Sequence, residues 1–134
     1  MTERALTTLF SAYLKKHPRE DTETFELKMV KGNSFSLKSV QPHQVLGLQT
    51  SLEALGYKIS DSPIYAGSKT RFTFKKPFDY VFIKAKRAYV TPIFYKPRKY
   101  KEVFLIPIQE FIKFSGKSVK MADLEKCGFE HFYL

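Results

Sequence analysis

The spacing of apolar residues changes along the chain, and each spacing predicts a different kind of element. Residues 3–16 carry apolar side chains at helical intervals, which predicts a helix that begins after Thr2 and ends before Pro18. Residues 24–29 alternate apolar and charged side chains, the pattern of a strand with one buried face. Residues 42–55 return to helical spacing, with a proline in the first turn. The buried face of the first helix is predicted to consist of Leu6, Leu9, Phe10 and Tyr13.

The second half of the chain is predicted to contain mostly strands, followed by two short helices. Apolar residues have a period of two from residue 57 onward, and the apolar run at 103–108 is typical of a strand at the centre of a sheet. The predicted strands cover 57–60, 70–75, 79–84, 88–95 and 103–108, with a hairpin turn at 85–87. The predicted helices cover 109–114 and 119–127. This order predicts a single α/β (α+β) domain over residues 1–134, with a central mixed β-sheet flanked by helices.

Positive charge is concentrated in one stretch of the sequence. Between Ser68 and Lys101 there are eleven Lys and Arg residues and one acid, Asp79, whereas the rest of the chain holds twelve basic and twelve acidic residues. A field of this kind attracts polyanions, and nucleic acid is the first candidate. An anionic membrane surface fits less well, because the stretch is predicted to form strands rather than an amphipathic helix. The residues predicted to contact nucleic acid are Lys75, Lys76, Lys86, Arg87, Lys96, Arg98 and Lys99.

Cysteine content and the first residues bear on the cellular compartment. Cys127 is the only cysteine, which excludes an internal disulfide framework and a cysteine-rich zinc site. Residues 1–5 lack the basic and apolar layout of a signal peptide, and no apolar run reaches the roughly 18 residues of a membrane span. We therefore expect a cytoplasmic protein with no membrane partner.

Glu26 and Lys28 leave the predicted strand from the same side, two residues apart. This pair suits metal-dependent phosphodiester hydrolysis, which needs carboxylates for Mg²⁺ and a cation to position water or to stabilise charge on the phosphate. The alternative is an ion pair on a solvated sheet face, worth roughly 0–1 kcal/mol. A second carboxylate would come from Asp79, the one acid of the basic stretch, although a local balance of charge is the alternative explanation for that residue.

Several short motifs resemble the core of PD-(D/E)xK nucleases, and most closely their Holliday-junction resolvases and related phage nucleases. They are Phe25-Glu26-Leu27-Lys28, Ser34-Phe35-Ser36-Leu37-Lys38, His43-Gln44 at the start of a helix, Lys76-Pro77-Phe78-Asp79-Tyr80 and Val103-Phe104-Leu105-Ile106-Pro107-Ile108. The resemblance covers most of residues 1–114. It implies that Glu26 and Asp79 bind Mg²⁺ or Mn²⁺ and that Lys28 supports the attacking water.

Two further residues gain a role through the resemblance. Gln44 would be an auxiliary polar group of the active site, and Glu3 on the first helix an additional acid. The aspartate of the family usually precedes its Glu-x-Lys motif, whereas Asp79 follows Glu26 in this chain. The implied fold is therefore restriction-endonuclease-like with a rearranged strand order, and the strand entered at Asp79 is predicted to lie beside the strand that carries Glu26. Asp21, shortly before Glu26, is the alternative aspartate.

Two functions remain open from the sequence. The first is an Mg²⁺-dependent DNA endonuclease of the Holliday-junction resolvase kind, which would act on branched DNA in recombination as a homodimer, at a nucleoid or a site of viral replication. The second is a catalytically inactive, nuclease-like module that holds DNA or RNA through its basic strands. The intact Glu26 and Lys28 favour the first function, and the displaced Asp79 favours the second.

Overall fold

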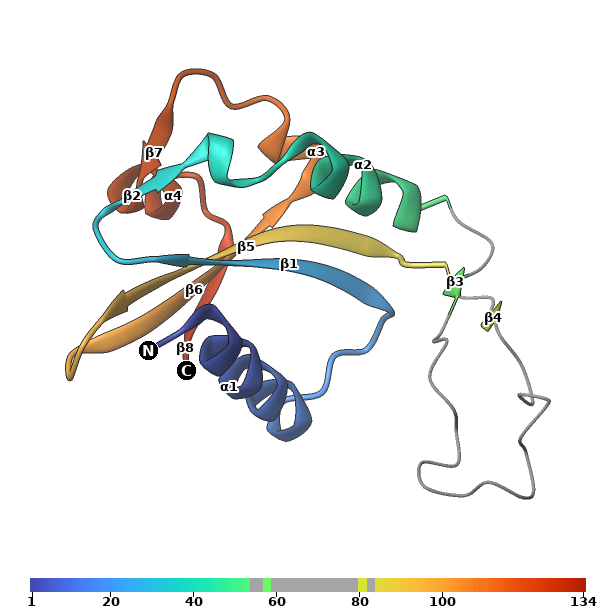
Figure 1. The fold of residues 1–134 in the computed structure, drawn as a ribbon, viewed down its shortest axis with the longest axis horizontal. Coiled ribbons are helices and arrows are strands. Elements are labelled where there is room, and N and C mark those ends of the chain that lie inside the picture. Colours follow the sequence, from blue (N-terminus) through green and yellow to red (C-terminus); the bar gives the residue numbers. More distant parts are fainter. Residues whose placement is uncertain (54–56, 59–79, 82–83) are drawn as a thin grey trace, which may run out of the picture.

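The computed structural model describes residues 1–53, 57–58, 80–81 and 84–134 and is built around a four-stranded sheet (Figure 1). The strands lie in the order β1 (Glu23–Val30), β5 (Arg87–Lys96), β6 (Tyr100–Pro107) and β8 (Glu130–Tyr133). β1 runs parallel to β5, and the β5–β6 and β6–β8 pairs are antiparallel. The central sheet is thus mixed and helices pack against it, which confirms the predicted fold class.

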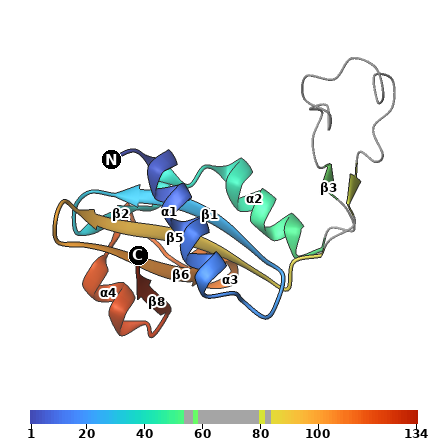
Figure 2. The same ribbon diagram turned by 90° about the horizontal axis from the view of Figure 1, so that it is seen from below.

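One face of the sheet is covered by α1 (Glu3–Lys16), which has the predicted bounds (Figure 2). The helix begins where expected because the hydroxyl of Thr2 accepts a hydrogen bond from a backbone amide of the first turn. Leu6 and Phe10 are buried together with side chains of β5 and β6. Leu9 was predicted to share this face but is 38% exposed, because the contact with the sheet follows the i, i+4 row through Leu6 and Phe10.

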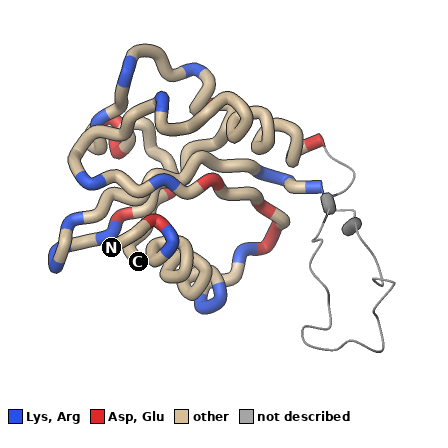
Figure 3. Tube along the Cα trace, viewed as in Figure 1, with Lys and Arg blue, Asp and Glu red and all other residues tan. Residues whose placement is uncertain are grey.

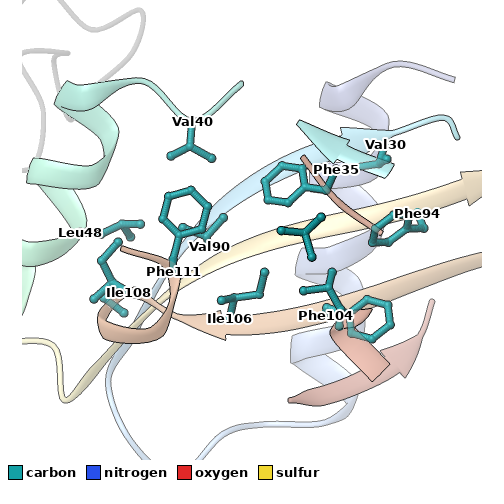
Figure 4. Close-up of a cluster of buried hydrophobic side chains, with 13 residues drawn as sticks. Val30, Phe35, Val40, Leu48, Val90, Phe94, Phe104, Ile106, Ile108 and Phe111 are labelled. Atoms are coloured by element: carbon teal, nitrogen blue, oxygen red, sulfur yellow. The ribbon is translucent and has the colours of Figure 1, made fainter. Parts of the chain in front are cut away.

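Among the described residues, the opposite face is covered by three helices and a small two-stranded sheet. The helices are α2 (Pro42–Ser51), α3 (Ile108–Phe111) and α4 (Met121–Lys126), and the small sheet pairs β2 (Ser34–Ser36) with β7 (Ser118–Lys120). Their apolar side chains meet those of β5 and β6 in the larger of two hydrophobic clusters (Figure 4). None of the helices in the described ranges is long and apolar enough to cross a membrane. The bulkiest fully buried residues of this cluster are Phe35, Phe94, Phe104, Ile106, Ile108 and Leu124.

The predicted hairpin turn at residues 85–87 is wrong. In that segment the Ala85 amide donates to the Ser51 carbonyl at 3.0 Å and the Lys86 amide donates to the Thr22 carbonyl at 2.7 Å, so the backbone is held by neighbouring segments before β5 starts at Arg87. The hairpin turn lies instead at residues 97–99, between β5 and β6. A proline in that segment favours a tight turn, whereas the segment 85–87 contains neither Gly, Pro, Asn nor Asp.

The C-terminal part contains two strands that the pattern of the sequence did not predict. The predicted helix 119–127 begins only at Met121, because Val119 is buried in the short strand β7. β8 then forms the edge of the main sheet next to β6, so the run at 103–108 belongs to an inner strand, as predicted, but not to the last one. In β8, the ring of Phe132 stacks on Tyr13 of α1 at 4.3 Å between centroids. This contact ties the C-terminus to the first helix.

Candidate active site at the edge strand

The alternation of side chains along β1 separates its apolar residues from its charged ones. Phe25, Leu27 and Met29 pack against the cluster under α1. Because successive side chains of a strand point to opposite faces, Glu26 and Lys28 leave the strand on the side covered by α2. The strand therefore presents Glu26 to the first turn of that helix, with Lys28 beside it on the same face.

The first turn of α2 delivers an amide to Glu26. Gln44 Nε2 donates a hydrogen bond of 2.9 Å to Glu26 Oε1. The orientation of this amide is fixed by the helix itself, since Gln44 Oε1 accepts a hydrogen bond of 2.9 Å from the backbone N–H of Gln41 in a capping box. The proline at the start of α2 needs no hydrogen-bond acceptor and has a helical φ angle. Gln44 is thus a rigid donor rather than a freely rotating surface amide.

Lys28 completes the group but remains at ion-pair distance. Its Nζ lies 3.7 Å from Glu26 Oε1, and the side chains of Lys28 and Glu26 are 15% and 29% exposed. Within the described residues, both contacts of the carboxylate therefore go to Oε1, and Oε2 has no partner. Negative charge is favoured here by the N-terminal end of the α2 dipole. The three side chains form a small, partly buried polar site that is still open to solvent.

Gln44 is the member of this site with the weakest signal in the residue pattern. Its position depends on Gln41, and Gln-x-x-Gln is a less familiar form of the capping box than a Ser or Thr followed by Glu. The resemblance to nucleases nevertheless assigned Gln44 to the site, and the structure brings it into contact with Glu26. Glu26, Lys28 and Gln44 are the predicted site residues that meet.

Other predicted site residues lie elsewhere or are not described. Asp79, Lys75 and Lys76 lie outside the described residues. The strand after Asp79 was expected next to β1, but β4 (Tyr80–Val81) pairs with β3 (Tyr57–Lys58), and β1 pairs with β5. That expectation is therefore wrong.

The placement of Glu3 is also corrected. It lies in the first turn of α1, which covers the face of the sheet opposite to the side chain of Glu26. The sequence could not show this, because the side of the sheet taken by α1 depends on the packing of Leu6 and Phe10. Glu3 does not join the site.

The described members of the predicted nucleic-acid-binding set divide between the two ends of β5. At the N-terminal end, Lys86 Nζ lies 3.3 Å from Asp21, and an Arg87 nitrogen lies 3.0 Å from Asp21 and 3.3 Å from Glu23. Asp21, the alternative aspartate, thus pairs with these cations rather than with the group around Glu26. A polar hollow of about 380 Å³ opens beside this ion cluster, which also includes Arg19.

Arg19 links the start of β1 to β8. It pairs with Glu23 and donates hydrogen bonds of 2.6 and 2.9 Å to the two carboxylate oxygens of Glu130. The side chain of Glu23 is only 3% exposed, so a buried carboxylate here depends on Arg19 and Arg87 for compensation. No pattern in the sequence points to this cluster, because its members are brought together by sheet pairing.

Replacing Glu130 by Gln is expected to reduce the dependence of stability on acid pH. The hydrogen-bonded guanidinium of Arg19 lowers the pKa of Glu130 below its ordinary value of 4.5. Since the pKa is lower in the folded chain, the stabilisation is complete above the unfolded value and is lost as the pH falls through the folded one. Urea unfolding between pH 3 and pH 7 checks this. At neutral pH the variant should lose about 1 kcal/mol or less of its free energy of unfolding. If its stability falls with decreasing pH as steeply as that of the wild type, Glu130 is not the source of the acid sensitivity.

The remaining predicted cations surround the turn between β5 and β6. Lys96 ends β5, and Arg98 and Lys99 are exposed in the turn. At about 3.3 Å per residue, β5 separates this group from Arg87 by roughly 30 Å. The described cations of the basic stretch thus form separate groups, and the group at the turn stands out in Figure 3.

Within the described ranges, no three His, Cys, Asp or Glu residues are grouped so that they could hold a metal ion. In the described residues, the group formed by Glu26, Lys28 and Gln44 contains one carboxylate, that of Glu26. Comparison of the chain with models of known families, with curated proteins and with solved structures finds no match.

Proposed function

We propose that this protein is an Mg²⁺-dependent DNA endonuclease whose active site contains Glu26, Lys28 and Gln44, and that four-way junctions are among its substrates. The observation that carries the proposal is the hydrogen bond from Gln44 to Glu26, with the Lys28 ammonium 3.7 Å from the same oxygen. Residues from two separate elements converge here in the combination that the resemblance to PD-(D/E)xK nucleases assigns to catalysis. A solvated ion pair alone would need no such converging amide.

The donor chemistry at Glu26 fits Mg²⁺. This ion prefers oxygen ligands and usually takes one or two protein carboxylates together with water and phosphate oxygens. Glu26 offers Oε2, which has no partner within the described residues, and Asp79 is the second carboxylate that the sequence assigns. When bound, the ion would stabilise charge on the scissile phosphate and activate water.

Lys28 and Gln44 have different roles in this proposal. The ammonium of Lys28 lies too far from Glu26 for a hydrogen bond, so within the described part of the chain its donors are left for the attacking water or for a phosphate oxygen. Gln44 holds one carboxylate oxygen of Glu26 by an oriented hydrogen bond and is therefore a positioning residue. Both side chains approach from the face of the sheet covered by α2.

Asp79→Asn tests the proposed second ligand. We expect the variant to lose Mg²⁺-dependent cleavage of a four-way junction, because Glu26 alone would hold the ion poorly beside Lys28. DNA affinity, measured in EDTA, should be unchanged or slightly higher, since a negative charge is removed from a basic stretch. Undiminished cleavage would remove Asp79 from the site, while loss of binding together with cleavage would indicate a structural role.

Lys96, Arg98 and Lys99 are expected to supply much of the DNA affinity. Replacing all three by Ala should make the slope of log affinity against log salt less steep by about 2–3, since each released phosphate contact contributes about 0.9 on duplex DNA. The matched control replaces three exposed lysines elsewhere, Lys113, Lys117 and Lys120, and removes the same charge. Equal slopes for the two triple variants would contradict a local role of the turn.

A second candidate function is a nuclease-like module that binds nucleic acid without cleaving it. It is favoured by one observation: the described residues place a single carboxylate at the site.

The proposed endonuclease would act as a homodimer, since a resolvase cuts two strands. Light scattering with and without a junction tests this, and a monomer in both states would contradict it.

A further inference from the structure

The hairpin formed by β5 and β6 ends in a basic ribbon at one extreme of the molecule (Figures 1 and 2). We call residues 95–101 the arm. Its last two cross-strand pairs are Tyr95 with Lys101 and Lys96 with Tyr100. In each pair the lysine lies over the tyrosine ring, with Nζ 5.9 and 5.8 Å from the ring centroids. Because neighbouring positions on a strand face opposite sides, each face of the arm carries one lysine and one tyrosine.

The arm carries cations without any acid of its own. Lys96, Arg98, Lys99 and Lys101 are its charged residues. The first acid after the arm is Glu102, which is buried and lies 3.3 Å from His131 Nδ1. No acid of the described residues forms an ion pair with these cations, so the arm presents positive charge to solvent (Figure 3), and its natural partner is a polyanion.

The turn at the end of the arm places an arginine where glycine is usual. The Lys99 amide donates to the Lys96 carbonyl at 3.1 Å, and Pro97 and Arg98 are the central residues of this turn. Arg98 has a φ of 62°, as in the third position of a type II turn, which favours Gly or Asn. A long side chain in the left-handed region is strained, and such strain is often retained where the side chain has a function. The strained residue is also the most distal cation of the arm.

The dimensions and chemistry of the arm fit duplex DNA better than other polyanions. The major groove of B-form DNA is about 12 Å wide and admits a two-stranded ribbon, whose strands lie about 4.8 Å apart. The major groove of an RNA duplex is too narrow for side chains to enter. Single strands need free aromatic faces for stacking, but the two tyrosines of the arm are partly buried and each is covered by a lysine.

We infer that the arm enters the major groove of duplex DNA, with Arg98 at its deepest point. This inference rests on the proposed function for the identity of the substrate. In the register of β1 and β5, Glu26 lies opposite Val90. Val90 precedes Arg98 by eight residues along β5 and the turn that follows it. Eight residues span roughly 26 Å at 3.3 Å per residue, or about 7–8 base pairs. The arm would thus hold the duplex less than one helical turn from a scissile phosphate at the proposed site around Glu26.

The first test uses fluorescence anisotropy in EDTA to compare the affinity of the protein for three duplexes of the same sequence. They are plain DNA, DNA in which every cytosine carries a glucosylated 5-hydroxymethyl group that fills the major groove, and the corresponding RNA. We expect the wild type to bind the filled-groove DNA and the RNA about fivefold or more weakly than plain DNA, a factor equivalent to roughly 1 kcal/mol of lost groove contact. The Lys96→Ala/Arg98→Ala/Lys99→Ala variant should bind all three nearly alike.

The second test uses Arg98→Gly. Glycine adopts a positive φ without strain, so the midpoint of thermal unfolding should rise, while the affinity for plain DNA should fall several-fold. If Arg98 had only a structural role, its replacement by Gly would change the stability of the protein without changing its affinity for DNA. Lys113→Gly, in an exposed position away from the arm, is the control for loss of one charge.

Three results would overturn the inference. They are equal wild-type affinity for plain and filled-groove DNA, tighter binding of single-stranded DNA or RNA, and unchanged DNA affinity of Arg98→Gly. Because binding is measured without metal, these results are independent of cleavage. If the wild type prefers plain DNA to filled-groove DNA but cuts no DNA, the proposed function alone is overturned. If it cuts DNA but binds plain and filled-groove DNA equally well, the inference alone is overturned.

Discussion

Glu26→Gln is expected to lower the rate of Mg²⁺-dependent DNA cleavage by about 10³-fold, which corresponds to several kcal/mol of lost stabilisation by the metal in the transition state. Gln has nearly the shape of Glu, and its amide oxygen can still accept the hydrogen bond from Gln44. The fold and the DNA affinity should therefore be kept, and single-turnover cleavage of an end-labelled junction measures the loss.

The matched control for this variant is Glu3→Gln. It makes the same chemical change in a helix on the opposite face of the sheet, and cleavage should continue at the wild-type rate. Lys28→Ala should be as inactive as Glu26→Gln, since it removes the cation beside the carboxylate. Near-wild-type cleavage by either Glu26→Gln or Lys28→Ala would place the active site elsewhere.

Phe94→Ala is expected to destabilise the fold by about 3–5 kcal/mol. Phe94 is fully buried and lies between Val30 of β1 and Glu102 of β6 in the sheet register. Its ring packs edge-on against Phe104, with centroids 5.6 Å apart (Figure 4). Removal of the ring leaves a cavity between the sheet and the helices that cover this face. The surrounding side chains are held by several strands and cannot move freely into that cavity.

Chemical denaturation followed by circular dichroism measures this loss. Leu46→Ala is the control, because Leu46 is 62% exposed on α2 and its removal should cost little. A loss below about 1 kcal/mol for Phe94→Ala would mean that the site can repack and that the core is less rigid than its burial indicates. The arm should also bind DNA more weakly in this variant, since Phe94 directly precedes it.

Local signals predicted the elements that carry the site. The bounds of α1 followed from a capping threonine and a proline, and the strand at Glu26 followed from five alternating positions. The meeting of Gln44 with Glu26 was expected from the resemblance, and it is produced by a parallel β1–α2–β5 crossover that places the helix over the edge strand. Each of these predictions depended on short stretches of sequence.

Three of the errors concern how distant segments pair or pack. The turn was predicted at residues 85–87 because the strand pattern has a gap there, but hydrogen bonds to Ser51 and Thr22 fill that gap. Glu3 was assigned to the site without knowledge of which face α1 covers. The strand after Asp79 was expected beside β1, yet β4 pairs with β3. Alternation in a sequence shows that a strand exists, but its partner is chosen by packing over the whole chain.

Cleavage of an end-labelled four-way junction by the wild-type protein, compared in Mg²⁺ and in EDTA, tests the central claim most directly. Glu26→Gln, assayed at equal concentration, shows whether any activity belongs to this chain rather than to a contaminant. We expect cleavage by the wild type in Mg²⁺, none in EDTA, and a loss of about 10³-fold in Glu26→Gln. A wild-type protein that binds the junction but leaves it intact in both Mg²⁺ and Mn²⁺ would contradict the account and favour the inactive binding module.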